Sequence, residues 1–378
     1  MYDIAIIGAG PGGSTLARLV ADRYRVLLID KRMLDGNASN PWHQKCCGGL
    51  LAPDAQKMIS QFGLGLPKQV LVDPQIFVVR AIDQTHGLER YYQRFYINLD
   101  RYRFDCWQLS LVPASVEIRL GTRFISFDPV NGGYNIQLQE KEKTATEKAK
   151  IIVGADGAAS RVRRMIAGGK TSPQKYIAVQ EWIESRGVVP YFSTFFDPTI
   201  TDFYGWTIPK GDMLLVGAAL APRKDVAKKF EALKQGLTRH GLQIGKTIAR
   251  EGAVISRPVS INQVYTGADG VALLGEAAGW ISPSSAEGIS YAFKSTHCMS
   301  EALQDGLTGF NARYARNTRK MRLNIVLKNL KSPFMYNPLI RKAILRSGIK
   351  SVKVVGPNLH QRIYKNVIFT NSTPKQNR

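Results

Sequence analysis

Three glycines and one acidic residue near the N-terminus have the spacing of a nucleotide-binding turn. Gly8, Gly10 and Gly13 follow an apolar run in the order G-x-G-x-x-G, and Asp30 ends a second apolar run. Glycines in this order let a pyrophosphate approach the N–H groups of a helix N-terminus, and an acid about 20 residues further on can bind ribose hydroxyls. The segment 2–32 therefore predicts a βαβ unit that binds FAD or NAD, with NADP less favoured.

Two later segments combine a short apolar run with a turn of small residues. One runs from 151 to 164 and contains Asp156-Gly157, and the other runs from 270 to 293 and contains Gly275-Glu276. Within the latter, residues 283–288 introduce a helix, and Ser and Pro suit its first positions. These segments are expected to belong to a binding site, although a capped structural helix would also explain the last of them.

The order and spacing of these segments resemble the glutathione-reductase-type flavoproteins of the p-hydroxybenzoate-hydroxylase class. The resemblance includes the Asp156-Gly157 pair and an R-x-x-F-D element at 101–105, in which Arg101 is expected to approach the cofactor. The Gly-Asp pair of that class is replaced by Gly275-Glu276 here. Because Glu has one more methylene group than Asp, its carboxylate is expected to contact the cofactor with a different geometry. The resemblance spans residues 1–295, implies FAD, and implies that the helix after 283–288 directs its positive end at the flavin.

Two short motifs narrow the resemblance to the geranylgeranyl reductases, which saturate isoprenoid chains. Residues 45–49, KCCGG, resemble the K-x-C-G-G element of that family, and residues 204–211, YGWTIPKG, resemble its aromatic-x-W-x-F-P-K-G element, with Ile208 in place of Phe. The resemblance implies that Cys47 lies on the substrate side of the flavin. A free cysteine is also commonly an inert, buried apolar residue, and this remains an alternative interpretation of Cys47. The W-x-W-x-I-P motif of flavin-dependent halogenases is a poorer match because Tyr204 replaces its first Trp.

The residues with predicted roles fall into three groups, and no metal site is predicted. The catalytic candidates are Cys47 and Trp206. The predicted cofactor-binding residues are Gly8, Gly10, Gly13, Asp30, Lys31, Cys47, Gly48, Gly49, Arg101, Asp156, Gly157, Gly275, Glu276, Gly288 and Ile289. The predicted substrate-pocket residues are Tyr204, Trp206 and Pro209.

The predicted fold class is α/β, with a Rossmann-like FAD-binding domain of the glutathione-reductase type, an inserted antiparallel β-sheet substrate domain and a basic helical C-terminus. Runs of aromatic and alternating apolar residues indicate the inserted sheet. The FAD-binding parts are expected at 1–74, 99–175 and 256–305, the substrate parts at 75–98 and 176–255, and the basic helical region at 306–378.

The charge is concentrated in the C-terminal region. The 378 residues carry a net charge of +23, and residues 306–378 contain 16 Lys and Arg and no Asp or Glu. Apolar residues at helical spacing between these charges favour helices that lie on anionic lipid. A solvated basic face or a site for an acidic redox partner would also fit, whereas nucleic acid is not expected because no nucleic-acid-binding motif is present.

The composition predicts a cytoplasmic protein. No apolar run reaches the length of a transmembrane helix, and four cysteines without a C-x-x-C pair indicate a reducing compartment. The basic region adds the expectation of peripheral attachment at the inner face of a membrane.

The predicted activity is the FAD-dependent reduction of carbon–carbon double bonds in an isoprenoid or other long apolar substrate, by hydride transfer from reduced flavin. A flavin-dependent monooxygenase acting on an aromatic or apolar small molecule is the alternative, and an electron carrier without its own substrate is a third reading. No second G-x-G-x-x-G follows a strand, so the electron donor is expected to be transiently bound NAD(P)H, a ferredoxin or a quinol.

Overall fold

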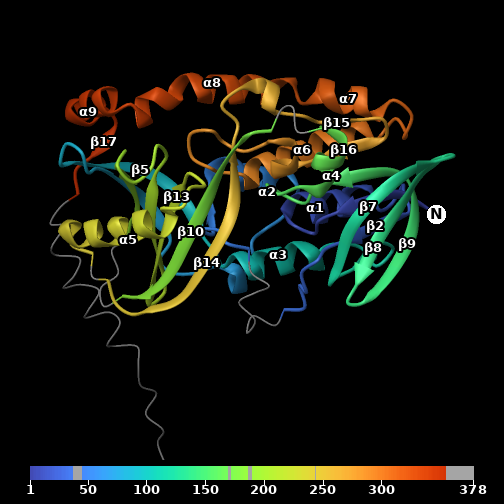
Figure 1. The fold of residues 1–378 in the computed structure, drawn as a ribbon, viewed down its shortest axis with the longest axis horizontal. Helices are drawn as coiled ribbons and strands as arrows, with labels where there is room; N and C mark the ends of the chain where they lie inside the picture. The colour runs from blue at the N-terminus through green and yellow to red at the C-terminus, as the bar shows by residue number, and fades with distance from the viewer. Residues whose placement is uncertain (37–44, 169–171, 186–189, 243, 355–378) are drawn as a thin grey trace, which may run out of the picture.

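The computed structural model describes residues 1–36, 45–168, 172–185, 190–242 and 244–354. Two sheets stand side by side, and a row of C-terminal helices runs across both of them (Figure 1). The first sheet carries the nucleotide-binding turn, and the second carries the aromatic motif at 204–211.

The first sheet has a parallel centre. Its strand order is β15 (Gly267–Ala268), β16 (Val271–Leu273), β9 (Lys143–Gly154), β1 (Tyr2–Ile7), β2 (Val26–Ile29) and β6 (Glu117–Arg119), and β7 (Thr122–Val130) and β8 (Gly133–Glu140) extend from β9. Successive side chains of a strand point to opposite faces. Ile4 and Ile6 accordingly pack against helices, while Ala5 and Ile7 pack against the β7–β8 hairpin.

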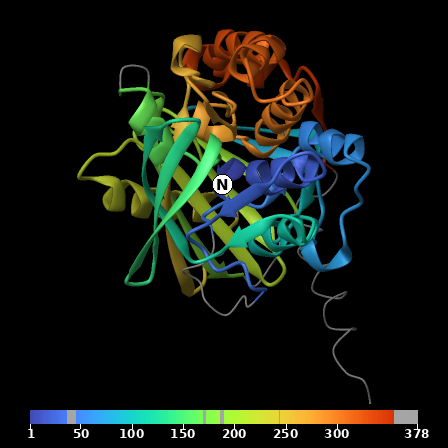
Figure 2. The ribbon, with the colours of Figure 1, turned by 90° about the vertical axis from the view of Figure 1, so that its right-hand side faces the viewer.

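Helices cover the Ile4 face of this sheet. They are α1 (Pro11–Val20), α3 (Arg101–Ser110), α6 (Ile289–Ala302) and α7 (Phe310–Asn317). Two further helices, α2 (Pro53–Gln61) and α4 (Arg161–Ile166), lie beside α6 and β7 respectively, and Figure 2 shows the layers end-on. A sheet with a parallel centre needs such cover because both of its faces are apolar.

The second sheet is mixed, not antiparallel as predicted. Its order is β14 (Thr247–Arg257), β10 (Gln174–Glu184), β13 (Met213–Leu220), β12 (Gly205–Lys210), β11 (Phe192–Phe196), β4 (Ile76–Asp83), β5 (Leu88–Asn98) and β17 (Ser351–Val352), and β3 (Leu50–Leu51) pairs with β5. The β4–β11 pair is parallel, with Phe192 opposite Val79. These strands come from separate segments, so no hairpin turn forces them to run antiparallel.

One face of the second sheet is covered by α5 (Val226–Leu237), through buried residues such as Phe230 and Leu233. The other face carries an aromatic cluster, defined as the buried residues Cys46, Tyr176, Ala178, Phe196, Phe203, Tyr204, Trp206, Ile208, Leu215 and Ala219.

The C-terminal helices are part of the fold. In α8 (Arg319–Tyr336), Met321 and Ile325 are buried against the first sheet's core. In α9 (Pro338–Ser347), the Arg341 guanidinium donates to the Asp83 carboxylate of β4, with Nε–Oδ2 and Nη2–Oδ1 distances of 3.0 and 3.2 Å. The described part of the basic C-terminal region therefore contacts both sheets, and β17 within it pairs with β5.

Candidate flavin and substrate site

The glycine turn between β1 and α1 is shaped for close approach to a ligand. A Cβ on Gly13 would lie 1.8 Å from the Gly8 carbonyl oxygen, so this turn requires glycine. A Cβ on Gly10 would meet no heavy atom within 4 Å, so Gly10 borders open space. Among the described residues no side chain caps α1, which leaves the N–H groups of its first turn to a ligand. This cradle fits the diphosphate of FAD.

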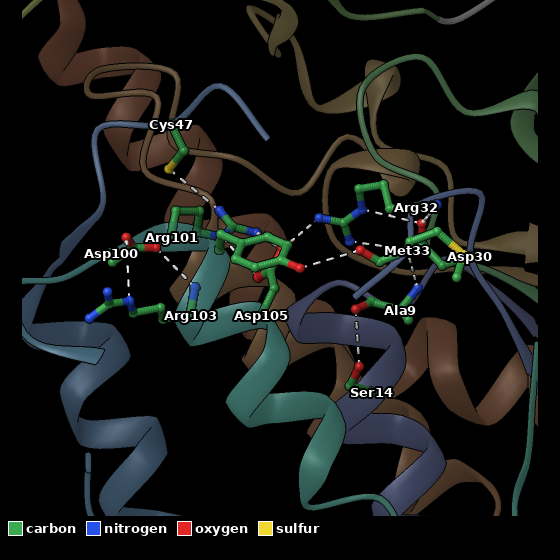
Figure 3. A network of polar contacts seen from close by, with 11 residues as sticks. Ala9, Ser14, Asp30, Arg32, Met33, Cys47, Asp100, Arg101, Arg103 and Asp105 are labelled. Carbon is green, nitrogen blue, oxygen red and sulfur yellow. Dashed lines mark hydrogen bonds and ion pairs between the residues drawn. The ribbon is translucent and has the colours of Figure 1, made fainter. Parts of the chain in front are cut away.

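Asp30 lies at the end of β2, as predicted, but its carboxylate is fully engaged. Its Oδ2 accepts from Ala9 N at 2.8 Å and from Arg32 Nη2 at 3.0 Å, and its Oδ1 accepts from Arg32 N at 2.8 Å and Arg32 Nε at 3.2 Å (Figure 3). A carboxylate offers about four acceptor positions. A ribose hydroxyl must therefore displace an Arg32 contact, while the predicted Lys31 is exposed to solvent.

A chain of alternating charges leads from Asp30 towards Cys47. Arg32 Nη1 donates to Asp105 Oδ2 at 2.8 Å, and Arg101 Nε donates to Asp105 Oδ1 at 2.9 Å (Figure 3). Burial raises the pKa of Asp105, but the two guanidinium groups outweigh burial and bring that pKa below its usual value. The R-x-x-F-D element thus places Arg101 one turn of α3 before Asp105, the acid that it pairs with. From this position Arg101 also contacts Cys47.

The two adjacent cysteines have opposite environments. Cys47 Sγ accepts from Arg101 Nη1 at 3.4 Å and from Gly49 N at 3.5 Å. Burial raises the pKa of the Cys47 thiol, but Arg101, the Gly49 N–H and Lys45 together lower it below the ordinary value. Cys46 lies in the aromatic cluster, where burial strongly raises its thiol pKa. Cys47 is thus the thiol that can become a reactive thiolate.

Lys210 is a further site residue, and its sequence motif alone predicts no role for it. Its buried Nζ donates to the Leu99 carbonyl at 2.8 Å and to the Gly49 carbonyl at 3.2 Å. Burial lowers the Lys210 pKa to about 7. Lys210 is the one charged residue in the sequence of strand β12, and this was the available signal, because burying an ammonium group costs free energy unless the group is hydrogen-bonded.

The KCCGG loop packs tightly against β12. A Cβ on Gly48 would lie 2.6 Å from Ile208 Cδ1, and a Cβ on Gly49 would lie 2.3 Å from the Leu99 carbonyl oxygen and 2.6 Å from Lys210 Nζ. Gly49 also has φ +60°, in the left-handed region that favours glycine. Both glycines therefore allow the two sequence motifs to come into direct contact.

Tyr204 and Trp206 lie together in the aromatic cluster. Trp206 Nε1 donates to Gln180 Oε1 at 3.3 Å, and the Tyr204 hydroxyl donates to the Ser285 carbonyl at 2.7 Å. Pro209 falls on the alternate set of β12 residues, and its carbonyl accepts from Asn98 Nδ2 at 2.8 Å. The geometry brings Tyr204 and Trp206 together but does not bring Pro209 into their cluster.

The two remaining acids face different directions. Glu276 Oε1 accepts from the Ser256 N–H of β14 at 2.7 Å, so this carboxylate binds the neighbouring sheet. Asp156 Oδ2 accepts from Arg161 N at 2.7 Å at the start of α4, whereas Asp156 Oδ1 is buried and has no partner within the described part of the chain. Burial raises the Asp156 pKa. Oδ1 is thus a polar atom that a bound cofactor could satisfy, beside Gly157 with φ +75°.

The helix expected after residues 283–288 begins at Ile289, with Gly288 as its N-cap. The prediction that Ser and Pro occupy its first positions was wrong, because residues 283–285 form a turn ahead of the helix and Ala286 after it has φ +50°. The Glu287 carboxylate accepts from the Ser290 N–H at 2.8 Å and takes the capping role. Its negative charge offsets part of the positive potential at this end of α6, near Gly275.

The chain has a geranylgeranyl-reductase-like fold. No family model matches the chain. The chain belongs to the family of protein CbrA: it is 39% identical to CbrA of Escherichia coli (strain K12) over 351 residues, which cover 93% of this chain and 98% of that protein. It is likewise 39% identical, with the same coverage, to CbrA of Shigella sonnei (strain Ss046). The name CbrA states no activity.

Experimental structures share the fold, and they include the following three proteins. A geranylgeranyl bacteriochlorophyll reductase-like protein from Thermoplasma acidophilum has a TM-score of 0.77 and 20% identity, with 96% of this chain and 95% of that chain covered. PqsL of Pseudomonas aeruginosa, a probable FAD-dependent monooxygenase, has a TM-score of 0.65 and 18% identity over 92% and 99% of the two chains. Halogenase PltM in complex with FAD has a TM-score of 0.67 and 14% identity over 98% and 83%.

Proposed function

We propose that the protein binds FAD and reduces carbon–carbon double bonds of an isoprenoid or other long apolar substrate. The observation that carries this proposal is the direct packing of the KCCGG loop on β12 through Gly48 and Gly49. This packing puts one cysteine beside Arg101 and the other in the aromatic cluster. Support for the substrate class comes from the reductase-like protein of Thermoplasma acidophilum, whose fold this chain shares.

The cradle around Gly10 and the unpartnered Asp156 Oδ1 would hold the cofactor. Reduced FAD supplies a hydride, and an alkene without an activating group accepts a hydride only when it is held in position and shielded from water. The aromatic cluster around Trp206 provides the apolar wall for such a substrate. Across the loop, Arg101 keeps a positive charge close to Cys47.

The experiment is a single turnover with chemically reduced holoprotein under anaerobic conditions, with geranylgeranyl diphosphate as the probe. Mass spectrometry should find products that have gained pairs of hydrogen atoms while the flavin is reoxidised. Trp206→Leu should slow this reoxidation without lowering the FAD content. Trp107→Leu is the matched control, because Trp107 packs beside Phe104 in a different cluster.

The same reduced protein separates the competing activities when oxygen is admitted. If a hydroxylated product forms and oxygen is consumed in stoichiometric amount, the protein is a monooxygenase and not a reductase. Flavin that is reoxidised by a ferredoxin or a quinone but by no isoprenoid would make the protein an electron carrier. NAD(P)H and reduced ferredoxin, tested in place of the chemical reductant, would identify the electron donor.

A further inference from the structure

Helix α8 exposes a continuous apolar stripe. Each member has another member three or four residues away, so together they share one side of the helix. They are Leu323, Val326, Leu327, Leu330 and Phe334, with exposed fractions from 36% for Val326 to 67% for Leu330. Met321 and Ile325 occupy the opposite, buried side. Met321 and Ile325 thus pack α8 onto the protein, and the residues of the exposed stripe are not needed for this packing.

The stripe continues onto α9. Leu339, at the start of α9, is 73% exposed, and Ile340 beside it is 37% exposed. The inward side of α9 is occupied by Arg341 and Leu345. Figure 1 shows α8 and α9 along one edge of the molecule, so their exposed sides can meet one extended surface.

Basic residues frame this apolar stripe. Arg319, Lys320 and Lys331 of α8 are exposed, and residues 306–378 contain no Asp or Glu. A groove of about 600 Å³ at the start of α8 is lined by Lys294, Arg316, Arg319 and Lys320, together with His297 and Glu301. One acidic residue among these bases leaves the groove net positive.

We infer that the exposed side of α8 and α9, defined by this apolar stripe and its basic frame, docks on the surface of a bilayer that contains anionic lipid. Exposed leucines flanked by lysine and arginine are what shallow insertion and headgroup attraction require together. An acidic protein would satisfy the charges but would not explain a stripe of this length. No helix in the described part of the chain could span a bilayer, so the attachment is to one face.

The helix that carries the docking side also contacts the site. At the end of α8, Met335 and Tyr336 pack against the aromatic cluster, and the Tyr336 hydroxyl donates to the Ser284 carbonyl at 2.6 Å. Docking through α8 would thus deliver a membrane-bound apolar molecule close to the aromatic cluster. This delivery role rests on the proposed function, whereas the docking itself does not and is measured without turnover.

The test is co-sedimentation of the holoprotein with vesicles of phosphatidylcholine that contain or lack phosphatidylglycerol. Wild-type protein should bind only the anionic vesicles and should dissociate as salt rises, because exposed charges are screened over about 8 Å at physiological ionic strength. Lys320→Gln/Lys331→Gln should lower the partition coefficient by roughly 30-fold, at about fivefold per basic residue. Leu327→Gln/Leu330→Gln should lower it on the order of tenfold or more, because both leucines leave water on insertion.

Matched variants keep the test specific. The double variant Lys148→Gln/Lys228→Gln removes the same charge from exposed positions on β9 and α5, and Ile248→Gln removes an exposed apolar side chain from β14. Both variants should bind as wild type. FAD content and circular dichroism show that each variant is folded. Equal binding to both vesicle types, or wild-type binding by the leucine variant, would overturn the docking surface. Failure of isoprenoid reduction would not affect this result.

Discussion

The Sγ atom of Cys47 lies 3.4 Å from Nη1 of Arg101, at one end of a line of charged groups whose other end is the Asp30 carboxylate. Asp105 binds Arg101 and Arg32 at the same time, so it connects the two ends. The nucleotide end and the thiol therefore share one electrostatic network. A change at either end is expected to be felt at the other.

The first prediction concerns the state of the Cys47 thiol. Arg101→Met should raise the pKa of Cys47, because it removes the positive charge that stabilises the thiolate. Alkylation of Cys47 by iodoacetamide near neutral pH should then slow by roughly tenfold or more. Peptide mass spectrometry over a range of pH measures this for Cys46 and Cys47 separately.

Arg103→Met is the control for this prediction, since Arg103 lies on the same helix but is exposed. It should leave the alkylation rate of Cys47 unchanged. Cys47→Ala should keep the FAD and change the flavin spectrum or its reoxidation, while Cys46→Ala should do little. If the two cysteine variants have the same flavin spectrum and the same rate of flavin reoxidation, the role of Cys47 is purely structural.

A second prediction separates folding from cofactor binding within the glycine turn. Gly10→Ala places a methyl group in open space, so the protein should fold but lose most of its flavin, because the methyl group occupies the diphosphate position. Gly13→Val should be more severe, since its Cβ clashes with the Gly8 carbonyl. Flavin absorbance per mole of protein measures both variants. Gly65→Ala, also in open space, should retain full flavin; a fully loaded Gly10→Ala protein would show that the diphosphate binds elsewhere.

The contrast between Asp30 and Lys210 shows what could be predicted from the sequence. Asp30 was predictable because strand, glycine turn, helix and second strand are contiguous, and local spacing sets its position. Lys210 meets Gly49 and Leu99 only after distant segments have packed, and spacing carries no information about such contacts. The same reason explains why Glu276 was not expected to bind Ser256, and why the parallel β4–β11 pairing was missed.

The third prediction is a pH dependence of stability caused by Lys210. Its folded pKa of about 7 lies below the unfolded value of 10.5, so between these values the unfolded chain binds more protons. Stability attributable to Lys210 should therefore rise as pH increases from about 7 to about 10. Lys210→Met should flatten this rise, although it also leaves two carbonyls without a donor. Urea denaturation of the wild-type and Lys210→Met proteins at about pH 7 and about pH 10 measures the free energy of unfolding of each. The same change in this free energy with pH in both proteins would contradict the prediction.

A fourth prediction concerns the ion pair between α9 and β4. Arg341→Met leaves the fully buried Asp83 carboxylate without its guanidinium and should lower the free energy of unfolding by about 3 to 5 kcal/mol. Arg346→Met, on the exposed side of the same helix, should change it little. Denaturant titration of the two variants measures the difference. Equal stability of both would show that α9 does not hold the second sheet.

The Arg341–Asp83 contact joins residues that are 258 positions apart in the chain. During synthesis at about 5 to 20 residues per second, Asp83 emerges some 10 to 50 seconds before its partner. Until Arg341 is available, the Asp83 carboxylate of β4 must stay hydrated or pair only with the nearby His86. The ion pair that joins α9 to the second sheet can therefore form only after α9 has left the ribosome.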